Sequence, residues 1–232
     1  MKNKREEQIA AKKRHKEQLK KKRKIEPDFE RAIPILTEKP TILIVCEGEN
    51  TEPSYFNQFR LSSATVKPVG EGYNTISLVN RAIQLSNEKS YGQVWCVFDK
   101  DDFSDNDFNN AIIMAKANNF GVAYSNQAFE YWLILHFDDH QGGGMHRNDY
   151  DDKINQLIKP FKIDYDGKKS KFINEDFFEL LNGYDKKTDK KRVDLAIYRA
   201  DRNYKQHNHS NPAKEESTTT VFELVEELLK HV

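Results

Sequence analysis

Two uninterrupted apolar runs constrain the fold of this chain more than any other feature of its sequence. One is Thr-Ile-Leu-Ile-Val-Cys at residues 41–46, and the other is Val-Trp-Cys-Val-Phe at residues 94–98. Neither run alternates apolar with polar side chains, which is typical of a strand covered on both faces in a parallel sheet. Each run therefore predicts a central strand with helices packed above and below it.

The segments around these strands alternate between helical and extended patterns. Apolar residues at helical spacing predict helices near 54–61, 74–88 and 107–118, and short apolar runs predict strands at 64–69 and 121–124. A repeated strand–helix order predicts an α/β fold: a Rossmannoid parallel sheet flanked by helices.

From residue 129 onward the sequence predicts mainly helices. Residues 129–137 are apolar almost all the way round and predict a buried helix against the sheet. Further helices are expected at 150–158, 175–181, 193–204 and 221–232. Thr220 and Glu223 have the spacing of a capping box, which predicts where the last helix starts.

We expect three parts along the chain. They are a basic N-terminal arm with its linker at 1–40, a catalytic core at 41–140, and a mainly helical C-terminal extension at 141–232 that packs on the core.

The formal net charge of zero hides a strong polarity along the chain. Residues 1–24 hold twelve Lys or Arg and three Glu, a net charge of +9, so the remainder is acidic. Ile9 and Leu19 are the large apolar side chains in this arm, which gives it no face to bury. We expect a solvated, disordered tail; attraction to nucleic-acid phosphates is a compatible second role.

Cysteine usage and hydropathy point to a protein of the cytoplasm. Cys46 and Cys96 both lie in predicted buried strands, so we expect reduced core residues and no disulfide. No run approaches the ~18 apolar residues that a membrane span needs, so no membrane partner is expected. No Gly-Lys-Ser/Thr phosphate loop occurs in the sequence, which argues against ATP hydrolysis through a P-loop.

Acidic side chains follow both central strands. Glu47 comes directly after the first run, and Asp99 and Asp101 come after the second. The carboxyl ends of neighbouring parallel strands meet at one edge of a sheet, where ligands collect. Each acid alone has an ordinary explanation as a helix cap or turn residue. Together they predict a site in which a hard cation, Mg²⁺, compensates the repulsion between the carboxylates.

Such a site suits chemistry on phosphodiesters. Carboxylate-bound Mg²⁺ keeps several waters and takes its remaining ligands from substrate phosphates, and we expect Mn²⁺ to substitute for it. In this role Glu47 would position or deprotonate the nucleophile. Asp99 and Asp101 would hold one or two metal ions that stabilise the transition state.

Three segments of the sequence resemble the main blocks of the RloB family. They are Val-Cys-Glu-Gly-Glu-Asn-Thr-Glu-Pro-Ser-Tyr-Phe at 45–56, Phe-Asp-Lys-Asp at 98–101, and Ser-Asn-Gln-Ala-Phe-Glu-Tyr-Trp-Leu-Ile-Leu-His-Phe at 125–137. The resemblance covers about residues 40–230 and includes the segment from Ser217, which is similar to the family's C-terminal helix. Gln127 stands where the family typically has proline, and we expect this to alter the start of the helix rather than the chemistry.

The resemblance implies a fold and a function. RloB proteins have a TOPRIM-type domain and are often encoded in restriction-modification and other anti-phage loci beside an ATPase. In TOPRIM folds a glutamate after the first strand and an Asp-x-Asp after a later strand bind Mg²⁺ for chemistry on nucleic-acid phosphates. Carried over, these positions are Glu47, Asp99 and Asp101.

Three further residues are candidates for the site. Glu130, on an otherwise apolar helix, is either a second metal ligand or a hydrogen-bond acceptor that anchors the helix. Glu52 falls where TOPRIM sequences often have another acid, but it also suits the first turn of a helix. Lys168 is a candidate cation for the scissile phosphate or the leaving oxygen, with a solvated basic turn as the alternative.

The segment 136–150 holds a run of three glycines with His136, His140 and His146, and it breaks the helical pattern. The histidine spacing fits no common zinc pattern. The glycines indicate mobility, so we expect either an ordinary disordered loop or a lid over the site.

Two functional hypotheses follow from the sequence. The first is a Mg²⁺-dependent TOPRIM nuclease acting on DNA or RNA in anti-phage defence. It would be regulated by a separate ATPase subunit and able to work as a homodimer. The second is a non-catalytic TOPRIM-like subunit that binds nucleic acid or a partner. A topoisomerase or primase is disfavoured, because 232 residues leave no room for a tyrosine-bearing cleavage domain or a template-handling domain.

Deletion of residues 1–24 is expected to leave the fold intact, because the arm has no apolar face to contribute to a core. It should weaken binding to nucleic acid or to a partner, most visibly at low salt, where charges are screened least. Binding assays over a salt series with the full and truncated chains check this. A salt dependence that the deletion leaves unchanged would reject the arm as a phosphate contact.

Overall fold

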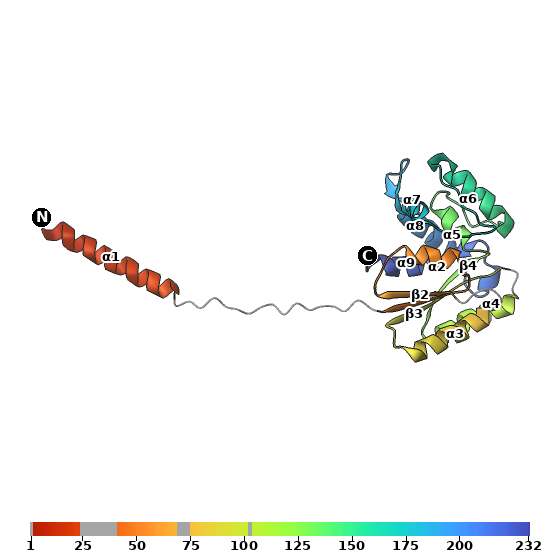
Figure 1. Ribbon diagram of the computed structural model, residues 1–232, viewed down its shortest axis with the longest axis horizontal. Coiled ribbons are helices and arrows are strands. Elements are labelled where there is room, and N and C mark those ends of the chain that lie inside the picture. The colour runs from red at the N-terminus through yellow and green to blue at the C-terminus, as the bar shows by residue number, and fades with distance from the viewer. Residues whose placement is uncertain (1, 24–40, 69–74, 102–103) are drawn as a thin grey trace. The chain divides into compact units, whose positions relative to one another are not determined.

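The computed structural model describes residues 2–23, 41–68, 75–101 and 104–232, and it divides into two compact units, Met1–Glu38 and Lys39–Val232. The linker predicted within 25–40 lies outside the described residues. The second unit holds the sheet and the helices that cover it (Figure 1).

A five-stranded, mostly parallel sheet forms the centre of the second unit. Its strands follow the order β2 (Ala64–Pro68), β1 (Ile42–Cys46), β3 (Gln93–Asp99), β4 (Gly121–Asn126) and β7 (Thr218–Thr219). The first four strands are parallel, and β7 pairs antiparallel with β4. The predicted α/β class with a parallel sheet flanked by helices is therefore confirmed.

Helices cover both faces of the sheet (Figure 1). Leu43 and Val45 of β1 pack with α3 (Thr75–Glu88) and α4 (Asp105–Ala117) on one face. Ile42, Ile44 and Cys46 of the same strand pack on the other face, in a core that includes residues of α2 (Thr51–Asn57), α5 (Glu130–Leu135) and α9 (Val221–Leu229). Successive side chains of a strand point to opposite faces, so both sets of β1 side chains are buried, which is why its sequence does not alternate.

The C-terminal half adds a helical layer to one side of this sheet. It consists of α6 (Tyr150–Ile158), α7 (Glu175–Asn182) and α8 (Arg192–Tyr204), with a short hairpin of β5 (Tyr184–Asp185) and β6 (Lys190–Lys191) between α7 and α8. Short 3₁₀ turns lie at Arg147–Asp149, Lys159–Phe161 and Pro212–Lys214. Side chains of α6, α7 and α8 belong to the same apolar core as α2, α5 and α9, which agrees with an extension packed on the core.

The capping box predicted at the last helix is wrong. The hydroxyl of Thr220 makes no cap hydrogen bond; it accepts from the backbone N–H of Tyr124 at 2.9 Å and donates to the carbonyl of Val122 at 3.0 Å. The short strand β7 was also not predicted, because its threonines resemble the lead-in to a helix. Strand β7 pairs with the edge of β4. The hydroxyl of Thr220, the next residue, bonds to the backbone of β4 instead of capping the helix.

The N-terminal arm is not the disordered tail that we predicted. Residues Lys2–Arg23 form a single helix, α1, and its described side chains at 9–20 are all exposed. Lys, Arg, Glu, Gln and Ala are strong helix formers, and the segment contains no glycine or proline to interrupt them. The expectation that the arm has no apolar face to bury is confirmed for those side chains.

Two other predictions concern the cysteines and the membrane. Cys46 and Cys96 are both buried with free thiols, as predicted. In the part of the chain that the structure describes, no helix combines the length and the apolar character needed to cross a membrane.

Replacement of Thr220 by Val is expected to destabilise the protein by about 1–3 kcal/mol for each backbone group of β4 that loses its partner. The methyl group matches the hydroxyl in size, so the loss reports hydrogen bonding rather than packing. Urea unfolding of the wild type, Thr220→Val and Thr220→Ser measures this. Thr220→Ser keeps the hydroxyl and should lie closer to the wild type; a Val variant as stable as the wild type would contradict the prediction.

Candidate active site at the carboxyl edge of the sheet

The two acidic strand ends lie side by side, as the sequence predicted. Strands β1 and β3 are parallel neighbours, with Cys46 opposite Val97 in the register. The backbone N–H of Glu47 donates to the carbonyl of Val97 at 2.9 Å, which places Glu47 at the end of this ladder. Asp99 is the last residue of β3. The carboxyl edge therefore brings Glu47 and Asp99 together.

Hydrogen bonds to the backbone fix both carboxylates. The N–H of Asp99 donates to Glu47 Oε2 at 3.3 Å. The N–H of Phe129, just before α5, donates to Asp99 Oδ2 at 3.0 Å. Each carboxylate thus directs one oxygen to a backbone N–H, and Asp99 joins the end of β3 to the start of α5.

Asp101 turns the chain away from the sheet. Its φ of 41° lies in the left-handed region, which Asp tolerates better than most residues. Its N–H donates to the carbonyl of Gln127 at 3.1 Å, so the turn runs beside the segment that leads into α5. The Asp101 charge raises the pKa of both Glu47 and Asp99, which places all three predicted acids in one electrostatic environment.

Glu52 is buried in the first turn of α2, where the residue is 5% exposed. A Cβ atom at position 48 would overlap the Glu52 carboxylate, so glycine is required there for this carboxylate to occupy its place. The charge of Glu130 raises the pKa of Glu52, and the charge of Lys171 lowers it. Glu52 therefore belongs to the acidic site and is more than a residue of the helix start.

Glu130 begins α5 and is anchored by a hydrogen bond. The hydroxyl of Tyr165 donates to Glu130 Oε1 at 2.9 Å, and it lies 3.4 Å from the Thr51 hydroxyl. The acceptor role considered for Glu130 is therefore present. Its charge also raises the pKa of Asp99, so Glu130 lies at the same acidic site.

Burial and mutual repulsion raise the pKa of Glu47, Glu52 and Asp99. Burial, with smaller contributions from Asp101 and Glu52, raises the pKa of Glu47 to about 8. Burial and then Glu130 raise the pKa of Glu52 to about 7. Burial, followed by the charges of Glu52, Asp101 and Glu130, raises the pKa of Asp99 well above its ordinary value. Carboxylates in this state gain from any cation that replaces the lost hydration.

The donor chemistry of this site fits a hard divalent cation, because all five side chains are carboxylates. The side chains do not form a closed ligand set: across 41–68, 75–101 and 104–232, no group of three or more His, Cys, Asp or Glu side chains is placed to hold a metal ion. One carboxylate oxygen of Glu47 and one of Asp99 each accept a hydrogen bond from a backbone N–H, which directs these oxygens to the backbone.

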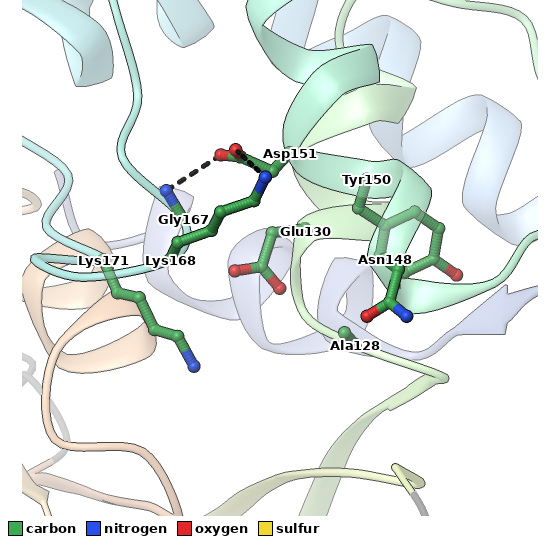
Figure 2. Close-up of a pocket in the computed structure, with 8 residues that line it drawn as sticks. All are labelled: Ala128, Glu130, Asn148, Tyr150, Asp151, Gly167, Lys168 and Lys171. Atoms are coloured by element: carbon green, nitrogen blue, oxygen red, sulfur yellow. Dashed lines mark hydrogen bonds and ion pairs between the residues drawn. The ribbon is translucent and has the colours of Figure 1, made fainter.

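Lys168 lies on the rim of a cavity beside the acids. The cavity has a volume of about 380 Å³ and shares Glu130 with the acidic site. Figure 2 shows Lys168 and Lys171 on one side of Glu130, with Asn148 and Tyr150 on the other. Lys168 Nζ lies 4.0 Å from Asp151 Oδ2 and its side chain is 70% exposed, so it is a solvated cation near the site.

Sequence reasoning selected Lys168 but did not single out Lys171 or Tyr165. Lys171 is the lysine whose charge lowers the pKa of Glu52, and Tyr165 donates to Glu130. The sequence pattern marks the segment from Tyr165 to Lys171 only as a whole. The conformation of its Tyr-Asp-Gly turn determines which lysine faces the acids. A one-dimensional pattern does not show which way that turn directs each side chain.

The histidine segment is tied to the rest of the fold. The N–H of Ser217 donates to the carbonyl of Gly142 at 2.7 Å, and Asn203 Nδ2 donates to the carbonyl of His140 at 2.8 Å. His136 is buried and bonded to the carbonyl of Trp132, and its burial lowers its pKa to about 3. These contacts fix the segment at several points, which favours neither a disordered loop nor a freely opening lid.

Without divalent metal, the free energy of unfolding is expected to fall as the pH rises from 6.5 to about 8. Up to about pH 7 both Glu47 and Glu52, and from there to about pH 8 Glu47, keep protons in the folded protein that the unfolded chain has lost. Rising pH therefore favours unfolding by up to about 1.4 kcal/mol per pH unit for each such group. Buried His136 has the opposite effect below 6.5, so the window excludes it.

Urea unfolding in EDTA at several pH values measures this dependence, and Glu47→Gln should flatten it. Glu49→Gln is the matched control, since Glu49 is exposed two residues away. A pH dependence identical in the wild type and Glu47→Gln would contradict the assignment.

Comparison with known proteins supports the family resemblance. A family model described as RloB-like protein matches residues 42–228, which is most of the chain and includes every acid of the site. No curated protein and no solved structure gave a match. On the strength of the family model, this chain belongs to the RloB-like family.

Proposed function

We propose that this chain is a Mg²⁺-dependent TOPRIM-type nuclease that cleaves nucleic-acid phosphodiesters and acts as an effector of anti-phage defence. One observation carries the proposal: two neighbouring parallel strands end in Glu47 and Asp99, which are joined by a hydrogen bond, with Asp101 in the same electrostatic environment. This is the pairing of a glutamate with an Asp-x-Asp that the family resemblance implies for metal-dependent phosphate chemistry.

The residues proposed to hold the metal are Glu47, Asp99 and Asp101, with Glu52 and Glu130 as further ligands. A bound Mg²⁺ or Mn²⁺ would supply positive charge to the scissile phosphate and lower the pKa of a bound water. The raised pKa values of Glu47, Glu52 and Asp99 support the proposal, because these carboxylates are short of compensating positive charge.

The side chains themselves have separable tasks in this proposal. Glu47, whose pKa is raised to about 8 without a cation, would ionise when a bound cation offsets its burial and would then position or deprotonate the attacking nucleophile. Asp99 is held by the Phe129 N–H and keeps α5 at the site. Gly48 leaves room for the Glu52 carboxylate. Lys168 and Lys171 offer positive charge to the substrate phosphates on the other side of Glu130.

The partners follow from charge and from the family resemblance. The described side chains of α1 at 9–20 are exposed and include five Lys or Arg against one Glu, which suits attraction to a polyanion. The sequence has no P-loop motif, so we propose that the regulating ATPase is a separate subunit, as the gene neighbourhoods of the family imply. A cytoplasmic location and a homodimer belong to the same proposal.

A non-catalytic binding subunit is the second candidate, and one observation favours it. The described carboxylates form no closed ligand set, and Glu47 and Asp99 both accept backbone hydrogen bonds that have a structural use. In this alternative the acids hold β1, β3 and α5 together, and the protein binds nucleic acid without cleaving it.

The deciding experiment is cleavage of plasmid DNA, single-stranded DNA and tRNA in Mg²⁺ or Mn²⁺ by the wild type, Glu47→Gln and Asp99→Asn. Both substitutions keep the size of the side chain and remove its charge, so we expect them to abolish metal-dependent products. Glu49→Gln, which changes an exposed acid beside the site, should cleave like the wild type.

Thermal unfolding with and without Mg²⁺ distinguishes the two candidate functions when the isolated chain shows no cleavage. A nuclease site should bind the ion and raise the unfolding temperature in the wild type but not in Glu47→Gln. Absence of cleavage with and without the ATPase subunit, together with no Mg²⁺-dependent stabilisation, would favour the binding subunit.

A further inference from the structure

The cavity next to Glu130 has a shape and polarity that the acidic site alone does not explain. It lies between the start of α6 and the turn that carries Lys168 and Lys171 (Figure 2). Its volume of about 380 Å³ is at the small end of the range for small-molecule sites, which run from roughly 300 to 1,000 Å³. A space of this size accepts one nucleotide-sized group and excludes a duplex.

The charges around the cavity are arranged asymmetrically. Lys168 and Lys171 stand on one side, where Asp151 Oδ2 lies 4.0 Å from Lys168 Nζ; the Glu130 carboxylate lies between, and Asn148 lies on the other side (Figure 2). A phosphate is attracted to the lysines and repelled by Glu130 and Asp151. The amide of Asn148 offers both a donor and an acceptor, which suits the edge of a neutral base. The cavity thus separates a place for a phosphate from a place for a base.

The turn that presents the lysines is fixed in advance. Asn155 Nδ2 donates to the carbonyl of Tyr165 at 2.7 Å, and the N–H of Gly167 donates to Asp151 Oδ1 at 2.9 Å. A Cβ at position 167 would approach Asp151 Oδ1 to 2.8 Å, so glycine allows the turn to lie against α6. The N–H of Lys171 closes the turn on the carbonyl of Asp166 at 2.8 Å. A fixed turn loses less freedom when it binds a ligand.

The surface beside the turn supports contact with an unstacked strand. Phe172, which directly follows Lys171, is 56% exposed. Exposed aromatic side chains next to lysines are the usual means by which proteins bind single strands, because each base offers a face for stacking. A paired base would present neither its face nor its pairing edge to such a surface.

We propose that this cavity receives one unpaired nucleotide of the substrate strand, with its phosphate on Lys171 and Lys168 and its base against Asn148. The substrate class is therefore a single strand, a loop or an extruded nucleotide, of DNA or RNA. This inference rests on the proposed function, because the cavity is a substrate subsite beside the acids. The unpaired nucleotide would position the neighbouring phosphodiester at Glu47 and Asp99.

Binding without cleavage tests the inference. Fluorescence anisotropy in EDTA compares a labelled single strand with the duplex of the same sequence, in one arm as DNA and in the other as RNA. A third probe is a strand of the same length built from abasic nucleotides, which has the same phosphates and no bases. We expect the full chain to bind the single strand about tenfold more tightly than either the duplex or the abasic strand in at least one arm.

Two variants locate the binding in the cavity. Lys171→Met removes a cation from the rim, and Asn148→Trp fills the base side from an exposed position; each should remove most of the preference for the single strand. Lys169→Met is the matched control, because Lys169 is an exposed lysine of the same turn that does not line the cavity. It should keep the preference.

Equal affinity for the single strand and the duplex, or for the strand with and without bases, would overturn the inference. Loss of the preference in Lys169→Met as large as in Lys171→Met would overturn it too, because general charge would then account for the binding. The DNA and RNA arms identify the sugar. These binding measurements test the subsite, and the separate cleavage assay tests the nuclease. Cleavage without the binding preference would refute the subsite alone, and the binding preference without cleavage would refute the nuclease alone.

Discussion

The half-buried carboxylate of Asp99 is the constraint on which the rest of the site depends. It ends a central strand, it accepts from the Phe129 N–H at the start of α5, and its own N–H donates to Glu47 on the neighbouring strand. A charged group at this depth is costly unless donors or cations surround it. The Phe129 N–H is a donor to this carboxylate, and the acids around Asp99 add repulsion instead of relief. The carboxylates at this edge of the sheet therefore lack compensating positive charge. The proposed nuclease site supplies that charge with a metal ion, and the proposed nucleotide subsite places lysines beside it.

The helical layer completes the site rather than merely covering the core. Tyr165 lies between α6 and α7 in the chain, and it reaches Glu130 at the start of α5. The turn from Asp166 to Lys171 is tied to α6 through Asp151 and brings two lysines to the far side of Glu130. Acids on the sheet edge and cations on the helical layer thus face the same cavity region. A boundary drawn near residue 140 would separate the carboxylates from the lysines, although all of them lie in one compact unit, Lys39–Val232.

The sequence predicted the features that depend on local pattern and adjacent strands. Unbroken apolar runs identified β1 and β3, and parallel neighbours bring Glu47 and Asp99 together by necessity. Features that depend on distant partners were missed. Thr220 has the right sequence neighbours for a helix cap, but its hydroxyl makes two hydrogen bonds to the backbone of β4 instead. The orientation of Lys171 depends on a turn held by Asp151 and Asn155. The helix α1 was missed because the absence of an apolar face was given more weight than the helix propensity of its residues.

The short strand β7 has a consequence for the order in which the protein becomes complete during synthesis. Thr219 pairs with Ser125, next to the segment that leads β4 into α5 and Glu130. A nascent chain that has not yet released residues 218–219 from the ribosome leaves the edge of β4 open and its polar backbone unpaired. All the acids of the site have emerged by then, but the strand that leads to α5 lacks its partner. The scaffold of the site is thus complete only after residues 218–219 have been translated, long after the acids that it holds.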